Sequence, residues 1–141
     1  NMTFTFESSM QHWNAIQRLH GRYSKEVNDV LKPKGLSKSQ FDLLMTLYHQ
    51  ESATQKSLER TLELSSGAIS QTVKKLLAEH LVIRKRINRE KRVLLTEQGT
   101  KLIQTSAPEI EEIDDRYFRA FTSKDHETFD QLLHKMQSDH F

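Results

Sequence analysis

The stretch Leu64–Thr96 constrains the fold more than any other part of the chain. Its first half predicts a helix, because Ser65 or Ser66 can accept hydrogen bonds from the unpaired N–H groups of a first turn. Apolar residues then recur at helical spacing and predict one buried face: Ile69, Val73, Leu76 and Leu77. The opposite face carries small and polar residues: Ser66, Gly67, Ser70, Gln71 and Lys74. Such a face can enter a groove and offer donors and acceptors to base edges.

A strongly cationic hairpin is predicted directly after this helix. Residues Val82–Ile87 and Lys91–Leu95 are rich in β-branched and apolar side chains, with a polar turn near Asn88, Arg89 and Glu90. The nine residues from Arg84 to Arg92 include six basic residues and a single acidic one. A helix with a readable polar face joined to a cationic hairpin is the layout of a winged helix-turn-helix DNA reader. The alternative is a solvated amphipathic helix and an edge hairpin protected by Lys and Arg.

Composition limits the class of protein. The 141 residues suit one domain, or one compact unit with a helical extension. The absence of cysteine excludes disulfides and thiolate metal sites and fits a reducing cytoplasm. We expect no signal peptide and no membrane span, and therefore a cytoplasmic protein. Residues 54–92 hold ten Lys or Arg against four acids, whereas residues 109–140 hold four against nine. This distribution favours a polyanion as the partner of the middle of the chain.

Two helices are predicted before the central stretch. The first spans about Ser8–Leu31, and its apolar and aromatic residues follow a near-heptad spacing that could pack within the chain or across a dimer: Met10, Trp13, Ile16, His20, Tyr23, Val27 and Val30. The second begins at Ser37, which forms a capping box with Gln40. Leu36 and Phe41 occupy the positions of a hydrophobic staple around that box.

The remaining helices also have recognisable starts. Thr54 should cap a short helix, Gln55–Leu62, and only Glu63 and Leu64 separate it from the next, which predicts a steep helix-turn-helix crossing. Thr96 should cap a further helix in which Pro108 produces a kink or a break. Thr122 or Ser123 should cap the last helix, with four apolar residues inside: Phe129, Leu132, Leu133 and Met136.

The predicted fold class is mainly α with a small β-hairpin wing. It is a winged helix-turn-helix flanked by N- and C-terminal dimerisation helices. We expect a dimerisation helix over residues 8–34, a DNA-binding lobe over 36–98, and C-terminal helices of the dimerisation region over 99–141.

Three segments carry a resemblance to a known family. They are residues 36–50, LSKSQFDLLMTLYHQ, residues 58–86, LERTLELSSGAISQTVKKLLAEHLVIRKR, and residues 95–99, LTEQG. The family is that of the MarR proteins, the multiple antibiotic resistance regulators. Its second helix is resembled by the first segment, its helix-turn-helix with the first wing strand by the second, and its LTxxG signature by the third. The resemblance implies a bacterial homodimer with recognition helices in successive major grooves and wings reaching the minor groove. It also implies a repressor of transcription that is released by a small, often aromatic, ligand.

The chain departs from the family pattern in three ways: Glu59 stands where the family usually has Ala, the turn carries Glu63, and the wing is about three residues shorter than usual and lacks an exact Asp-x-Arg. Glu63 stands in the turn where the family usually has Gly, so a residue with a side chain must hold the turn conformation. Glu90-Lys91-Arg92 is the nearest match to the usual Asp-x-Arg of the wing.

The candidate DNA-binding residues follow from these patterns. Gln71 suits bidentate contact with adenine and Ser70 can contact either kind of base, while Lys56, Lys74 and Lys75 are better suited to phosphates. Arg89 and Arg92 are the wing candidates for the minor groove or its phosphates. The full predicted set is Thr54, Gln55, Lys56, Ser65, Ser66, Gly67, Ser70, Gln71, Lys74, Lys75, Arg84, Arg86, Arg89, Lys91 and Arg92.

A small aromatic effector could bind between the first helix and the DNA-binding lobe. The candidate lining combines aromatic walls with polar tips, although the same residues could be plain core: His20, Tyr23, Phe41, Met45 and Tyr48. The seven histidines are scattered without helical zinc spacing, so we expect no metal and no cofactor. No catalytic constellation is present, so we expect no enzyme. Two functions remain: a regulator that binds a pseudo-palindromic double-stranded operator, and a winged-helix module that docks on protein or RNA.

Overall fold

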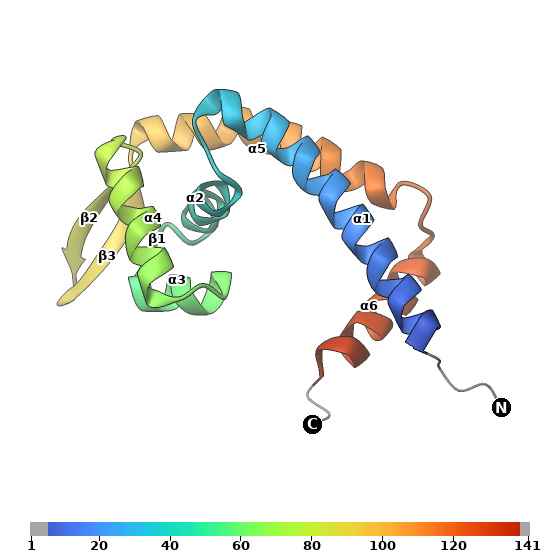
Figure 1. Ribbon diagram of the computed structural model, residues 1–141. Helices are drawn as coiled ribbons and strands as arrows, with labels where there is room; N and C mark the ends of the chain where they lie inside the picture. Colours follow the sequence, from blue (N-terminus) through green and yellow to red (C-terminus); the bar gives the residue numbers. More distant parts are fainter. Residues whose placement is uncertain (1–5, 139–141) are drawn as a thin grey trace.

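The computed structural model describes residues 6–138 of the chain. The elements follow one another as α1 (Phe6–Leu31), the 3-10 helix η1 (Lys32–Lys34), α2 (Lys38–Gln50), β1 (Ser52–Ala53), α3 (Gln55–Leu62), α4 (Ser66–Ala78), β2 (Val82–Ile87), β3 (Glu90–Leu95), α5 (Glu97–Phe118) and α6 (Ser123–Gln137). Figure 1 shows a lobe of α2–α4 and the sheet at one end of α5, with α6 and the start of α1 at the other end. Within the described part, no helix is long and apolar enough to cross a membrane. The mainly helical winged helix-turn-helix expected from the sequence is confirmed.

The sheet has three strands, whereas the sequence predicted only a hairpin. Its order is β1-β3-β2, with antiparallel pairing of Ser52 to Leu94 and Ala53 to Val93. Strand β1 was missed because two residues are too short to display the alternation that identifies a strand. It pairs the open edge of β3 and joins the wing to the segment that starts α3.

The predicted helix starts are confirmed. Ser37 and Gln40 form the capping box of α2, and Thr54 and Thr96 cap α3 and α5. Of the paired candidates, Ser65 rather than Ser66 caps α4, and Thr122 rather than Ser123 caps α6. These caps set where α3 and α4 begin and therefore how they cross.

The core of the lobe is a continuous apolar cluster. Ile69, Val73 and Leu76 of α4 are fully buried in it, together with residues of α2, α3, α5 and the sheet. Leu36 and Phe41, the predicted staple, are also buried in this cluster. Because the apolar face of α4 is occupied by the core, only its polar face remains available to a partner.

The LTEQG segment joins α5 to the end of α4. The Thr96 hydroxyl donates to the His80 carbonyl oxygen at 2.7 Å and accepts from the Gly99 N–H at 3.0 Å. A Cβ on Gly99 would lie 2.1 Å from the Leu81 carbonyl oxygen, so only glycine allows this approach. The motif is therefore a packing device that fixes the angle at which α5 leaves the lobe.

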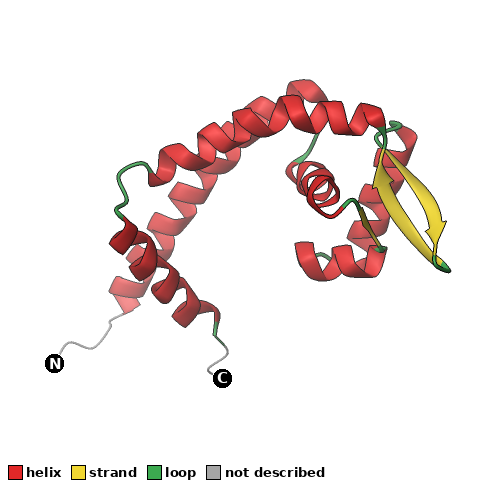
Figure 2. Ribbon diagram, turned by 180° about the vertical axis from the view of Figure 1, so that it is seen from behind, coloured by secondary structure: helices red, strands yellow, loops and turns green. Residues whose placement is uncertain are grey.

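Helix α5 then runs to the far end of the molecule without a break (Figure 2). A break at Pro108, one of the two predicted outcomes, is wrong. Proline removes the hydrogen bond to the Gln104 carbonyl, but Ile103 and Ile110 on either side are buried in the core and hold the helix in place.

Two reciprocal tyrosine–carboxylate contacts fasten α1 to α5. Tyr23 of α1 donates to Asp114 Oδ1 at 2.6 Å, and Tyr117 of α5 donates to Glu26. The two tyrosine rings meet edge to face at 5.7 Å between centroids, and Arg116 pairs with Glu26 at 2.9 Å. Burial, with the bond to Asp114, raises the pKa of Tyr23, and the bond from Tyr117 lowers the pKa of Glu26.

The apolar residues of α6 do not lie inside the single chain, contrary to the prediction. Leu132, Leu133 and Met136 are exposed, and Phe129 is half-buried beside Phe118 and Phe121. Ring contacts of Phe129 and His126 with Phe118 and Phe121 join α6 to the end of α5 and the loop after it, and they leave Leu132, Leu133 and Met136 exposed.

Candidate nucleic-acid interface

The outer face of α4 presents the side chains predicted to read bases. Ser66, Gly67, Gln71 and Lys74 are exposed, whereas Ser70 is half-buried. Gln71, Lys74 and Lys75 line one shallow surface hollow with Thr72, whose hydroxyl is turned back to the Ala68 carbonyl at 2.8 Å. Gln71 is therefore better placed than Ser70 to reach a base.

The start of α3 has fewer available groups than the sequence implied. The Thr54 hydroxyl accepts from the Ser57 N–H at 3.1 Å as the helix cap. Gln55 accepts a hydrogen bond from Arg84 of the wing at 3.3 Å. Lys56 is exposed, and it is the member of the predicted α3 set that best suits phosphate contact.

The turn between α3 and α4 has the special backbone expected at Glu63. This residue lies in the left-handed region with φ 53° and ψ 44°, and its N–H bonds back to the Glu59 carbonyl. A residue with a Cβ adopts this conformation at a cost of about 1 kcal/mol that glycine avoids. Ser65 follows at once as the cap of α4, and its hydroxyl accepts from the Ala68 N–H at 3.1 Å.

The wing ends in a two-residue turn. Asn88 and Arg89 both have positive φ, 50° and 69°, as type I′ turns require. Glu90 pairs with Ile87 as the first residue of β3, so the prediction that it lies in the turn is wrong. Arg86 Nη1 donates to the Arg89 carbonyl oxygen at 3.1 Å and braces the tip.

The six cations of the wing divide into two groups. Arg84, Arg86 and Arg92 make hydrogen bonds within the chain, to Gln55, to the Arg89 carbonyl, and to Ser52 and Glu90. Lys85, Arg89 and Lys91 are exposed, and no hydrogen bond or ion pair within residues 6–138 engages their charged groups. Lys85 was absent from the predicted set, although its position in the basic run of β2 could have indicated it.

The candidate effector residues do not come together as one set. His20 and Tyr23 line a hollow of about 420 Å³ whose other walls are α1 and α5 residues, among them Asp114, Tyr117 and Phe118. Phe41 is buried in the lobe core, Met45 packs against that core, and Tyr48 is exposed and accepts a hydrogen bond from Gln104 at 3.4 Å. The sequence missed the α5 side of this hollow because nothing local indicates that α5 crosses α1 there.

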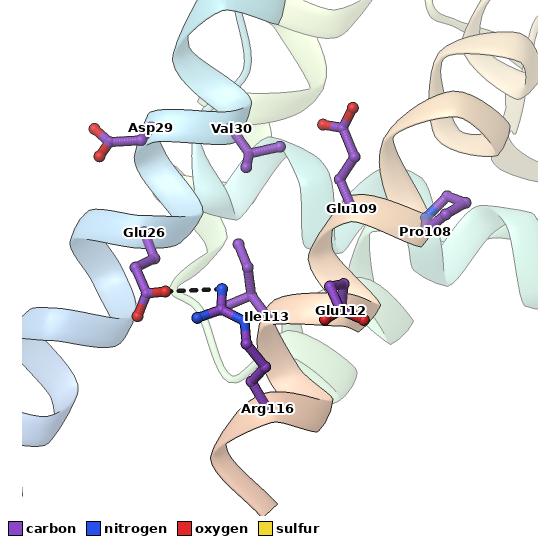
Figure 3. Close-up of a pocket in the computed structure, with 8 residues that line it drawn as sticks. All are labelled: Glu26, Asp29, Val30, Pro108, Glu109, Glu112, Ile113 and Arg116. Carbon is purple, nitrogen blue, oxygen red and sulfur yellow. Dashed lines mark ion pairs between the residues drawn. The ribbon is translucent and has the colours of Figure 1, made fainter. Parts of the chain in front are cut away.

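A second hollow of about 590 Å³ between α1 and α5 is lined by four carboxylates (Figure 3). Each carboxylate already has a cationic partner in the chain: Glu26 with Arg116, Asp29 with Lys25, Glu109 with Lys34, and Glu112 with Arg119, at 2.9 to 3.3 Å. This groove is therefore internally neutralised. Among the described residues no group of metal-ligating side chains gathers, and His140 lies outside them.

Comparison with known proteins finds similarity to one family. The sequence model of the MarR family matches residues 36–94. An HTH-type transcriptional regulator of Bacillus anthracis is 29% identical over 97 residues, which cover 69% of this chain and 66% of the relative, just under two thirds of its length.

Solved structures extend the match to the whole fold. The complex of S. aureus MepR with DNA has a TM-score of 0.81 at 19% identity and covers 94% of both chains. CouR from Rhodococcus jostii RHA1, bound to p-coumaroyl-CoA, has a TM-score of 0.78 at 24% identity and covers 90% of this chain and 92% of that chain. At these identities the likeness shows a shared fold that includes the flanking helices.

Proposed function

We propose that the chain is a member of the MarR family of winged helix-turn-helix proteins, and that it is a dimeric transcriptional regulator that binds a specific double-stranded operator. The observation that carries this proposal is the pairing of two surfaces on one side of the lobe. The polar face of α4 is exposed because its apolar face is buried in the core, and the cationic wing lies beside it. MepR, which shares the fold, was solved in complex with DNA.

The two surfaces would divide the work of binding. Helix α4 enters the major groove, where Gln71 reads a base edge and Ser66 and Gly67 allow close approach. Lys56, Lys74 and Lys75 neutralise phosphates on either side of the groove. The exposed wing cations Lys85, Arg89 and Lys91 bind the neighbouring minor groove or its phosphates.

The operator would be pseudo-palindromic because the protein would bind it as a homodimer. Met10, Trp13 and Ile16 of α1 and Leu132, Leu133 and Met136 of α6 are all exposed in the single chain. A monomeric soluble protein rarely leaves contiguous apolar faces of this kind in water. We assign the helices of residues 8–34 and 99–141 to the dimerisation region, whose exposed apolar side chains would form the interface, with half-sites about one helical turn apart.

We further propose that the protein is a repressor released by a small aromatic ligand bound beside α1. The hollow lined by His20, Tyr23 and Phe118 offers apolar walls and a few polar groups, as small-molecule sites do. CouR, of the same fold, was solved with p-coumaroyl-CoA. Calorimetry with a panel of aromatic acids tests this part, and the expected result is binding that lowers the affinity for operator DNA.

Selection of duplexes from a random pool, followed by salt titration, tests the main proposal. The selected duplex should contain an inverted repeat and bind about a thousandfold more tightly than random duplex at the same salt. Equal affinity for selected and random duplexes, or preference for RNA, would instead indicate a docking module.

A further inference from the structure

We propose that Arg84 and Arg92 are positioning residues that fasten the wing to the start of the helix-turn-helix, and that the DNA contacts of the wing are made by its other exposed cations. This inference rests on the proposed DNA-binding function and refines which wing residues serve it. It separates two roles that a count of basic residues treats as one.

Arg92 is the stronger of the two attachments. Its Nε donates to Ser52 Oγ at 2.8 Å and its Nη2 to the Ser52 carbonyl oxygen at 3.2 Å. Its Nη1 donates to Glu90 Oε1 at 3.0 Å. All three guanidinium nitrogens are therefore occupied, and only 27% of the side chain is exposed. Three of its five N–H donors are thus engaged within the chain, which leaves fewer of them for a phosphate than an unbound guanidinium offers.

Arg84 makes the second attachment from the other strand. It pairs with Val93 of β3, which in turn pairs with Ala53 of β1, so the three residues form one row across the sheet. From this row Arg84 Nη2 reaches Gln55 Oε1 at 3.3 Å. Gln55 is the first residue of α3, immediately after the Thr54 cap. One arginine from each wing strand thus ends on the short segment 52–55.

These attachments matter because the wing projects away from the lobe, as Figures 1 and 2 show. A two-stranded hairpin is marginally stable by itself, and β1 supplies only two residues of backbone pairing. Side-chain bonds at the base of the hairpin fix its direction relative to α3. They therefore determine where the tip, with Arg89, lies when α4 is in the groove.

The direction in which operator affinity changes in one variant distinguishes an anchoring role of Arg92 from a direct DNA contact. Ser52→Ala removes the hydroxyl that holds Arg92 and changes no charge. If Arg92 is an anchor, this variant should weaken operator binding about threefold to tenfold because the tip is no longer held in place. If Arg92 contacts DNA, releasing it from Ser52 should leave affinity unchanged or raise it. Ser39→Ala, at the exposed start of α2, is the matched control and should have no effect.

A mutant cycle on the full-length protein tests the route of action. Arg92→Gln should weaken operator binding about tenfold in the wild type, but no more than about twofold in a variant that already carries Lys85→Ala, Arg89→Ala and Lys91→Ala, because Arg92 acts through these cations. Additive losses would mean that Arg92 binds DNA independently and would overturn the proposal.

Two further measurements keep the result interpretable. Thermal unfolding of each variant, followed by circular dichroism, should stay within a few degrees of the wild type, so that altered binding is not loss of fold. The wild-type protein must prefer operator over random duplex. Failure there overturns the proposed function, whereas wild-type specificity with an inert Ser52→Ala overturns only the positioning role.

Discussion

The winged-helix lobe (α2–α4 with the sheet) and the helical extension (α1 and α6) differ in how far their apolar residues are buried. In the lobe, Leu43, Leu58 and Ile69 have no exposed surface. In the extension, Trp13 of α1 is 56% exposed and Met136 of α6 is 59% exposed. Both regions carry the same helical spacing of apolar residues. The lobe completes its own core, whereas the extension leaves apolar side chains exposed, which is the basis of the proposed dimer.

The two regions also differ in what holds them to α5. The lobe is joined to it by close backbone packing at Gly99 and by buried aliphatic side chains. The extension also has buried aliphatic side chains at this junction, Val27 of α1 and Ile113 of α5, but it adds polar contacts of Tyr23 and Tyr117 with carboxylates on the opposite helix. Apolar packing is indifferent to pH, whereas tyrosine–carboxylate bonds are not. Stability measurements should therefore separate the regions.

The largest effect is expected on dimer affinity, from substitutions in the exposed apolar faces of α1 and α6. Trp13→Glu combined with Leu133→Glu would place charge in an apolar dimer interface, where burial of an unpaired charge is strongly unfavourable. Dimer affinity should fall at least a thousandfold, about 4 kcal/mol. Sedimentation velocity at micromolar concentration would show a monomer in place of a dimer.

Gln11→Glu, on another face of α1, is the control and should remain dimeric. If the wild-type protein sediments only as a monomer, no second copy covers these apolar faces, and the proposed dimer interface is wrong.

The second largest effect is expected on the stability of the lobe, from a substitution at its junction with α5. Gly99→Ala places a Cβ 2.1 Å from the Leu81 carbonyl oxygen, and both groups belong to packed backbone. Overpacking of this kind should destabilise the fold by about 3 kcal/mol or more, measured by urea unfolding.

Gly21→Ala in α1 is the matched control because a Cβ there meets nothing within 4 Å. It should stabilise the helix by about 0.5–1 kcal/mol. Equal effects at the two glycines would show that the lobe junction tolerates movement.

A structural feature could be predicted from the sequence when the residues that cause it lie close together in the chain. The caps at Ser37, Thr54 and Thr96 were predictable, because a cap acts within three residues of itself. The special backbone at Glu63 was expected from the family resemblance, because the family usually has Gly at this position of the turn. Strand β1 was not, since two residues show no period and pairing with Val93 is decided by the tertiary fold.

The candidate site follows the same rule. The polar face of α4 is set by helical spacing, so the exposure of Gln71 and Lys74 agrees with the prediction. The bonds of Arg92 to Ser52 join residues 40 positions apart, and nothing in the local sequence indicates them. The hollow beside His20 was likewise half missed, because its second wall comes from α5.

Within the lobe, two substitutions on α4 should separate base reading from phosphate binding. Gln71→Ala should change the preferred base at one position of each half-site and cost about 1–3 kcal/mol on the best site, with little loss on random duplex. Lys74→Ala should weaken both duplexes and keep the preference. Binding curves on a panel of single-base operator variants give both quantities. The recognition face is misassigned if Lys74→Ala alone alters base preference.

In the extension, Tyr23 should make stability depend on alkaline pH. Its folded pKa is raised above the ordinary value of 10.0, so its contribution is complete below pH 10 and is lost as pH rises toward the folded pKa. Tyr23→Phe should cost about 1 kcal/mol at neutral pH for the lost hydrogen bond. It should also flatten the decline of unfolding free energy above pH 10.

Tyr48→Phe, at an exposed position of the lobe, is the control for this measurement. If it changes the alkaline decline as much as Tyr23→Phe does, the pH dependence does not arise at the α1–α5 contact.

The smallest expected effect lies where the two regions meet on α5. The Ser106 hydroxyl is fully buried and has no hydrogen-bond partner among the described residues, whereas its neighbour Thr105 donates to the Leu102 carbonyl at 3.0 Å. A buried hydroxyl without a partner is unfavourable, and alanine also forms helix better than serine. Ser106→Ala should therefore stabilise the protein by about 0.5–1 kcal/mol in urea unfolding, while Thr105→Ala should not. Destabilisation by Ser106→Ala would mean that the hydroxyl has a partner, such as an ordered water, at the point where the lobe core continues into the extension.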